Sequence, residues 1–292
     1  MRGIRRSVAG WLVEWACEAT SRPSGDRLNR LAASLSPGWS VPWYNLGFSA
    51  KYAGDWSTSL VHNRRAAELD PSDEASWWNL GIAATALRDW ETARLAWAAC
   101  GIELSTDTGE PRFESLTACV RLNPEREGEV VWGHRIDPVR LVIDSIPLPE
   151  SRHRYRDMVL HDGAQEGTRE IDGVQVPVFD ELELMQASCY STFEALIVMP
   201  ASEMEAELVR RCLDEEIGIE DWSTIRRLCE ECSRGNPAPH MCSRSSDSDK
   251  KSYGFACEYE ARLRDVLQGW AAANPGARFD SIELRLRAEE GK

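Results

Sequence analysis

The last third of the chain alternates between strand-like and helix-like patterns of apolar residues. The segments are a strand at 192–198, a helix at 202–216, strands at 219–228 and 252–257, a helix at 260–273 and a strand at 278–286. The helical segments have apolar side chains at a spacing of three to four residues, whereas the strand segments are short apolar or alternating runs. This order predicts a ferredoxin-like βαββαβ sandwich over residues 188–292.

The middle of the chain has only the strand pattern. Short β-branched runs lie at 130–132, 140–143, 158–160 and 174–179. Turn-forming pairs such as Asp137-Pro138 and Asp162-Gly163 separate them. We therefore expect a small barrel or a curved antiparallel sheet over residues 129–187. Residues 106–128 are rich in Gly, Pro and Asp, and we expect them to form a connector.

The first third repeats itself at an offset of 34 residues. The segment PWYNLG at 42–47 aligns with SWWNLG at 76–81, and further identities follow in both helices of the pattern. Eight identities fall within one 34-residue window, against about two expected from average composition. A fixed period of this length predicts stacked helical hairpins.

The period and its residues resemble the tetratricopeptide repeat. Trp43, the Leu46-Gly47 pair, Ala66 and Pro71 fit one unit at 39–72, and a second unit follows at 73–105. Residues 5–38 fit a degenerate first unit. The resemblance implies an all-α solenoid over residues 1–105, so the whole chain is expected to be α+β. The chain also resembles bacterial proteins that join a few tetratricopeptide units to a strand-rich tail.

The resemblance further implies a concave groove that binds a protein or peptide partner. The groove-facing positions are Tyr44, Phe48, Lys51, Tyr52, Trp78, Ile82 and Thr85. This face is aromatic and weakly charged, which suits an apolar segment of a partner. The alternative is that these aromatic residues pack against the protein's own remaining residues.

A cysteine-rich segment interrupts the predicted sandwich at 229–251. Cys229, Cys232, His240 and Cys242 have the spacing C-x2-C-x7-H-x-C. Four such ligands complete a closed tetrahedron around Zn²⁺, so any zinc bound here is expected to be structural. The alternatives are a flexible tip with incidental thiols and, less favoured because no thioredoxin-like pattern surrounds it, a redox CxxC pair.

Polar residues concentrate in the predicted barrel, and no catalytic residues are assigned among them. They are His134, Asp137, His153, His161, Asp162, Asp180, Glu181 and Glu183. A metal or acid–base site built from His134, His161 and Asp180 is conceivable, but their spacing does not require one. The chain contains no P-loop, dinucleotide fingerprint, nucleophile elbow or HExxH motif.

Charge and composition exclude several classes of protein. The net charge is −14, and all of it lies in residues 106–292, because acidic and basic residues balance in 1–105. An acidic surface disfavours binding to nucleic acid. No apolar run is long enough to cross a membrane. Nine cysteines, an odd number, argue against a secreted disulfide framework, and we expect a cytoplasmic protein.

These observations favour a non-enzymatic protein-interaction module, an adaptor or scaffold that binds a partner through its helical repeats. The alternative is an enzyme or a small-ligand sensor in residues 129–292 that the helical part recruits. A ferredoxin-like fold does not decide between them, because it hosts many unrelated activities.

Overall fold

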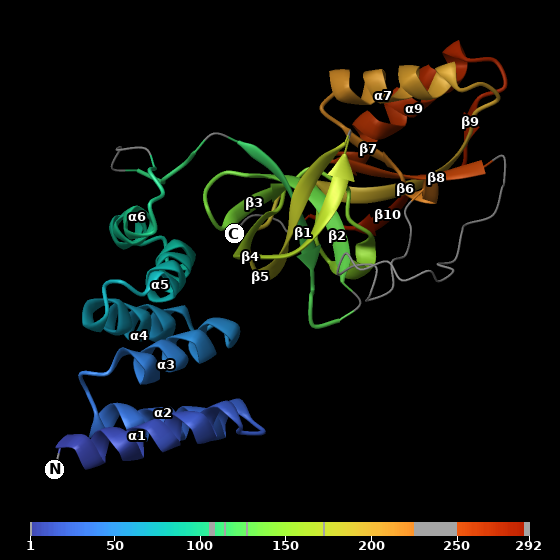
Figure 1. Cartoon of the computed structure of the whole chain (residues 1–292). Coiled ribbons are helices and arrows are strands. Elements are labelled where there is room, and N and C mark those ends of the chain that lie inside the picture. The colour runs from blue at the N-terminus through green and yellow to red at the C-terminus, as the bar shows by residue number, and fades with distance from the viewer. Residues whose placement is uncertain are drawn as a thin grey trace. The chain divides into compact units, whose positions relative to one another are not determined.

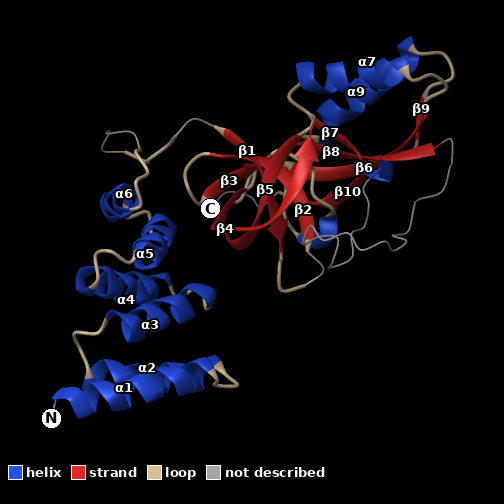
Figure 2. Ribbon diagram, in the orientation of Figure 1, coloured by secondary structure: helices blue, strands red, loops and turns tan. Residues whose placement is uncertain are grey.

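Six helices occupy the N-terminal part of the chain, and strands with two further helices follow, so the fold class is α+β as predicted (Figure 2). The computed structural model describes residues 2–104, 109–113, 115–126, 128–171, 173–224 and 250–288. The chain divides into two units. One comprises residues 1–114 with 137–139, and the other comprises 115–136 with 140–292.

In the helical unit, each helix packs antiparallel against the next helix along the chain (Figure 1). Its helices are α1 (Arg2–Cys17), α2 (Arg22–Leu35), α3 (Ser40–Tyr52), α4 (Trp56–Leu69), α5 (Glu74–Ala86) and α6 (Trp90–Ala99). Small residues on α4, α5 and α6 are fully buried, Ala66, Ala83 and Ala96 among them. Each helix therefore approaches the next one closely.

Two helix starts are built in the same way, 34 residues apart. The Asp55 side chain accepts a hydrogen bond from the backbone N–H of Thr58 at 3.0 Å and caps α4. The Asp89 side chain accepts one from the N–H of Thr92 at 3.1 Å and caps α6. Aspartate is among the best N-cap residues because its carboxylate satisfies a donor that has no partner within the helix.

A pair of tryptophans repeats at the same offset. The indole N–H of Trp43 donates to the carbonyl of Pro37 at 3.3 Å, and that of Trp77 donates to the carbonyl of Pro71 at 3.1 Å. Each bond ties the first helix of a pair to the proline that precedes it. The 34-residue period of the sequence is therefore also a period of contacts.

The first five strands form a closed barrel. They are β1 (Leu116–Leu122), β2 (Glu129–Arg135), β3 (Arg140–Ile143), β4 (Met158–Ile171) and β5 (Val174–Gln186), with a short 3-10 helix, η1 (Pro149–Ser151), before β4. Successive strands pair antiparallel, and β1 closes the barrel by pairing parallel with β5. Side chains that fill its interior include Val120, Val131, Leu141 and Val159.

The barrel differs from the sequence prediction at its start. Residues 106–128 were expected to form a connector, but Leu116–Leu122 within them form β1. Ala118, Val120 and Leu122 face the barrel core. This strand alternates with Thr, Cys and Arg, so it lacks the continuous β-branched run by which the other strands were recognised.

The second sheet has the strand order β10-β6-β8-β7, all antiparallel. Its strands are β6 (Ser191–Val198), β7 (Gly218–Asp221), β8 (Lys250–Cys257) and β10 (Glu283–Leu286), and the short β9 (Arg278–Phe279) also pairs with β6. Helices α7 (Glu203–Asp214) and α9 (Glu260–Ala273) lie side by side on one face of this sheet (Figure 1). Leu208, Leu263 and Trp270 anchor them to a core that includes Phe255.

The predicted strand at 219–228 is shorter in the structure. It ends at Asp221, and a 3-10 turn, η2 (Trp222–Thr224), follows. The remaining residues of that prediction lie outside the described part of the chain. Among the described helices, none has the length and apolar character that crossing a membrane requires.

Candidate partner-binding surface of the helical unit

Three aromatic residues form a continuous row on α3. Tyr44, Phe48 and Tyr52 are four residues apart, so their side chains lie on one face of the helix. The ring centroids of Tyr44 and Phe48 are 6.0 Å apart, and those of Phe48 and Tyr52 are 4.9 Å apart in an edge-to-face arrangement. We call these three residues the aromatic row.

The aromatic row is accessible at its C-terminal end. The exposed fraction is 41% for Phe48 and 39% for Tyr52, whereas Tyr44 is partly buried. Isolated exposed apolar side chains are common on protein surfaces, but contiguous large ones are characteristic of interaction sites. Neighbouring rings that already contact each other also lose little conformational entropy on binding.

Two cationic side chains border the row. The Lys51 ammonium lies 5.1 Å from the Phe48 centroid and 4.6 Å from the Tyr52 centroid, and the Lys51 side chain is buried. The Arg22 guanidinium lies 5.8 Å from the Tyr52 ring and donates to the Tyr52 carbonyl at 2.7 Å. Cations at this range interact favourably with aromatic rings, so they add positive charge without removing the rings from the surface.

The predicted groove residues of the second unit are less accessible. Trp78 is partly buried and packs edge-to-face on Trp97, with centroids 5.1 Å apart. Ile82 and Thr85 are fully buried. Exposed surface among the predicted groove residues is therefore concentrated on α3.

The predicted zinc ligands Cys229, Cys232, His240 and Cys242 lie outside the described residues. Among the residues that are described, no group of three or more His, Cys, Asp or Glu side chains could hold a metal ion.

The three polar residues considered for an acid–base site have separate surroundings in the barrel. His134 Nδ1 is hydrogen-bonded to Asp144 Oδ2 at 2.8 Å, and the Asp180 carboxylate forms an ion pair with Arg121 at 2.5 Å. His161 is fully buried and stacks on a phenylalanine ring. The structure thus gives each of the three its own neighbours.

A buried His–Glu pair, which the sequence did not predict, joins the segment before β4 to β5. His153 Nε2 is 2.6 Å from Glu181 Oε1, and Nδ1 is 2.9 Å from the carbonyl oxygen of Ser151. A carboxylate and a carbonyl oxygen both accept hydrogen bonds, so this arrangement favours the protonated imidazole, in which both ring nitrogens donate. Burial lowers the pKa of His153, but the Glu181 carboxylate and the Ser151 carbonyl outweigh it and raise the pKa overall.

Two partly buried carboxylates hold the segment between β3 and η1. Glu129 accepts from the backbone N–H of Leu148 with both carboxylate oxygens, at 3.1 and 3.0 Å. Glu220 accepts from the N–H of Ile146 at 2.5 Å, and Trp222 Nε1 donates to the Ile146 carbonyl at 3.0 Å. Burial raises the pKa of Glu129 to about 7 and also raises that of Glu220. These contacts join the barrel to the second sheet.

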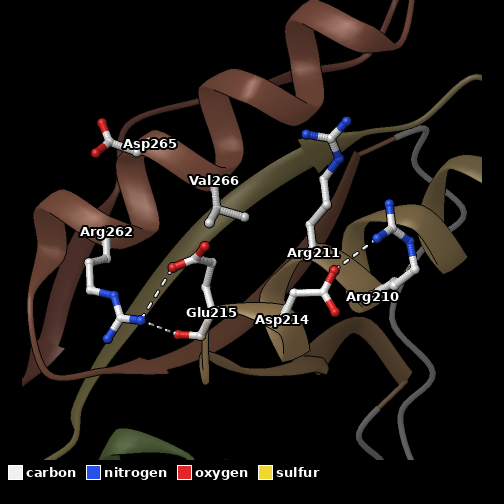
Figure 3. A pocket seen from close by; sticks show the side chains of 7 residues that line it. All are labelled: Arg210, Arg211, Asp214, Glu215, Arg262, Asp265 and Val266. Carbon is white, nitrogen blue, oxygen red and sulfur yellow. Dashed lines mark hydrogen bonds and ion pairs between the residues drawn. The ribbon is translucent and has the colours of Figure 1, made fainter.

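An open hollow of about 570 Å³ lies between α7 and α9 (Figure 3). Its lining residues are Arg210, Arg211, Asp214, Glu215, Arg262, Asp265 and Val266. Arg210 pairs with Asp214 at 2.8 Å, and Arg262 pairs with Glu215 at 3.2 Å. Because the arginines already have carboxylate partners, this hollow does not favour an anionic ligand.

Comparison with known protein families found no family that matches the chain, and comparison with curated proteins found no relative. The function is therefore inferred from the chain's own residues.

Proposed function

We propose that the chain is a non-enzymatic protein-interaction module whose α3 surface binds a protein or peptide partner. The observation that carries this proposal is the aromatic row, with Phe48 and Tyr52 exposed and in mutual contact. Aromatic side chains at the centre of an interface provide much of the binding free energy in protein complexes.

The repetition of contacts supports a tetratricopeptide-type solenoid as the framework. The caps at Asp55 and Asp89 recur at the 34-residue offset, as do the Trp43 and Trp77 hydrogen bonds. Solenoids of stacked helix pairs present extended binding surfaces on the first helix of each pair. In this framework α3 is such a first helix.

The second sheet supports a ferredoxin-like sandwich in the other unit. Numbered within that sheet, the main strands follow the order 4-1-3-2 with all neighbours antiparallel, and both helices cover one face. This arrangement suits the βαββαβ pattern. It does not assign an activity, because unrelated functions occur on this fold.

The surroundings of the aromatic row indicate the chemistry of the partner. The rings favour apolar or aromatic side chains, and the exposed Arg22 beside Tyr52 adds positive charge, which favours acceptors such as backbone carbonyls. Residues 1–105 carry no net charge, so the helical unit offers no overall electrostatic attraction for a nucleic acid. A segment of another protein meets these conditions.

The test compares the partners recovered by matched variants of the full chain. Phe48→Ala combined with Tyr52→Ala removes the exposed rings, and Val61→Ala combined with Leu95→Ala is the control. Val61 and Leu95 are 60% and 61% exposed, on α4 and α6. We expect quantitative affinity purification to recover a partner with the wild type and the control, and at least tenfold less with the α3 variant. Equal recovery by all three proteins would reject α3 as the binding surface.

A further inference from the structure

His161 on β4 is a fully buried side chain with one unused donor. Its Nδ1 atom accepts a hydrogen bond from the backbone N–H of Gly163 at 3.1 Å. That nitrogen therefore carries no proton, and the ring proton resides on Nε2. Within the part of the chain that the structure describes, Nε2 has no hydrogen-bond partner. An unpaired buried donor is costly, so such groups in native proteins call for an acceptor.

The ring of Phe179 brings His161 and Arg135 together. His161 stacks on this ring with centroids 4.4 Å apart and an interplanar angle of 17°. The Arg135 guanidinium carbon lies 5.0 Å from the centroid of the same ring. Arg135 has other interactions as well, and its guanidinium keeps a permanent positive charge beside the ring.

These residues lie at one end of the barrel. Arg135 is the last residue of β2, and Leu160, which precedes His161, pairs with Arg140 at the start of β3. Ligand sites of β-barrels are commonly found at such an end.

The pairing of β4 with β5 is irregular at His161. His161 pairs with Glu181, and the next pair is Gln165 with Phe179, so three residues of β4 lie opposite one residue of β5. Bulges of this kind redirect side chains and occur frequently beside functional sites. Gly163, in the bulge, has a positive φ of 78° and supplies the N–H that fixes the His161 tautomer.

The charges around the unused donor define the ligand. Burial and, to a lesser degree, the Arg135 charge lower the pKa of His161 well below its ordinary value, so the ring is neutral and donates one N–H. A metal cation is disfavoured, because Nε2 carries the proton and Arg135 repels positive charge. An anionic acceptor gains from both groups, and a carboxylate can accept from the imidazole while facing the guanidinium.

We propose that His161 and Arg135, which both contact the Phe179 ring, form a carboxylate-binding site at this end of the barrel. The carboxylate is either a free small acid or the side chain of an acidic residue. This site is independent of the aromatic row and does not depend on the function proposed for α3.

The experiment follows the His161 ring by NMR in the full-length, ¹⁵N-labelled protein. Sodium acetate and N-acetylglutamate amide are titrated separately, with sodium chloride at equal ionic strength as control. We expect a saturable shift of the Nε2–H signal with at least one carboxylate and none with chloride. Saturation by acetate identifies a free-acid site, and saturation by the glutamate compound alone identifies a side-chain site.

Two variants test the assignment of the groups. His161→Phe retains a ring to stack on Phe179 but has no donor, and Arg135→Met removes the charge. We expect each to weaken carboxylate binding at least tenfold, measured by calorimetry. The proposal is overturned if wild-type Nε2–H exchanges only with water and shows no saturable shift, or if His161→Phe or Arg135→Met binds as tightly as the wild type. If His161→Phe does not fold, the wild-type titration and the Arg135→Met variant still test whether a carboxylate binds at this site.

Discussion

A β-carbon placed on Gly81 would lie 2.6 Å from Cη2 of Trp97, so the indole ring packs directly on the backbone of Gly81. Gly47 meets the Asn63 side chain in the same way. Gly47 and Asn63 occupy the positions 34 residues before Gly81 and Trp97. Helices α5 and α6, like α3 and α4, therefore approach each other through a glycine. A side chain at either glycine would separate the helices or displace the residue opposite.

Gly81→Ala tests this contact. The added methyl group has no room beside the Trp97 ring, and overpacking of this kind costs about 1–3 kcal/mol of unfolding free energy. Gly10→Ala is the control, because a β-carbon at Gly10 would meet no atom within 4 Å. Since alanine favours helices, we expect the control to be unchanged or more stable. Urea denaturation measures both, and equal stability of the two variants would contradict the packing described.

Glu129 makes stability depend on pH in a defined direction. Burial raises the pKa of Glu129 to about 7, above its ordinary value of 4.5. The folded state thus holds this proton more tightly, and its contribution is fully present below pH 4.5 and is lost as pH rises through about 7. We expect the stability of the wild type relative to Glu129→Gln to fall by about 1–3 kcal/mol across that window.

Chemical denaturation between about pH 5 and pH 8 measures this difference, because these values bracket most of the titration. Glu125→Gln is the control, since Glu125 is exposed and precedes β2. Parallel stability profiles for the wild type and Glu129→Gln would contradict this prediction. They would mean that the Glu129 carboxyl has the same pKa in the folded and the unfolded protein.

The pKa of His153 is predicted to depend on its partner Glu181. Burial lowers the pKa of His153, but the hydrogen bond and charge of Glu181 oppose this effect and the pKa is raised overall. The stability from this pair is present below about pH 6.5 and is lost as pH rises through the raised folded pKa. Glu181→Gln removes the negative charge but leaves the burial, so the pKa of His153 is expected to fall below that of the wild type.

NMR titration of the His153 ring in both proteins provides the measurement, and Glu170→Gln on the exposed end of β4 is the control. An unchanged His153 pKa in Glu181→Gln would mean that Glu181 does not stabilise the protonated imidazole.

The parts of the fold that local pattern determines were predictable. The helix at 260–273 matches α9, because Leu263, Leu267 and Trp270 lie on one buried face at helical spacing. Strand β1 was missed, because its alternating residues carry no continuous apolar run. Closure of the barrel depends on β1 pairing with β5, which are far apart in sequence, and no local signal specifies that contact.

The candidate sites also divide into features that local sequence spacing predicts and contacts between residues that are distant in sequence. The four-residue spacing of Tyr44, Phe48 and Tyr52 on one helix is visible in the sequence. His153 and Glu181 are 28 residues apart, and only the barrel brings them within 2.6 Å. His161 was recognised as a polar residue of the barrel, but its unused donor follows from the Gly163 hydrogen bond and could not be anticipated.

Site-specific photo-cross-linking at position 48 tests the central claim most directly. Phe48 is replaced by the photoreactive benzoylphenylalanine in the full chain, and Val61 on α4 is replaced in the same way as the control. We predict that light joins a partner protein to position 48 and not to position 61, and that Tyr52→Ala reduces the yield. Equal cross-linking from both positions, or none from position 48 while the partner is bound, would contradict binding at the aromatic row.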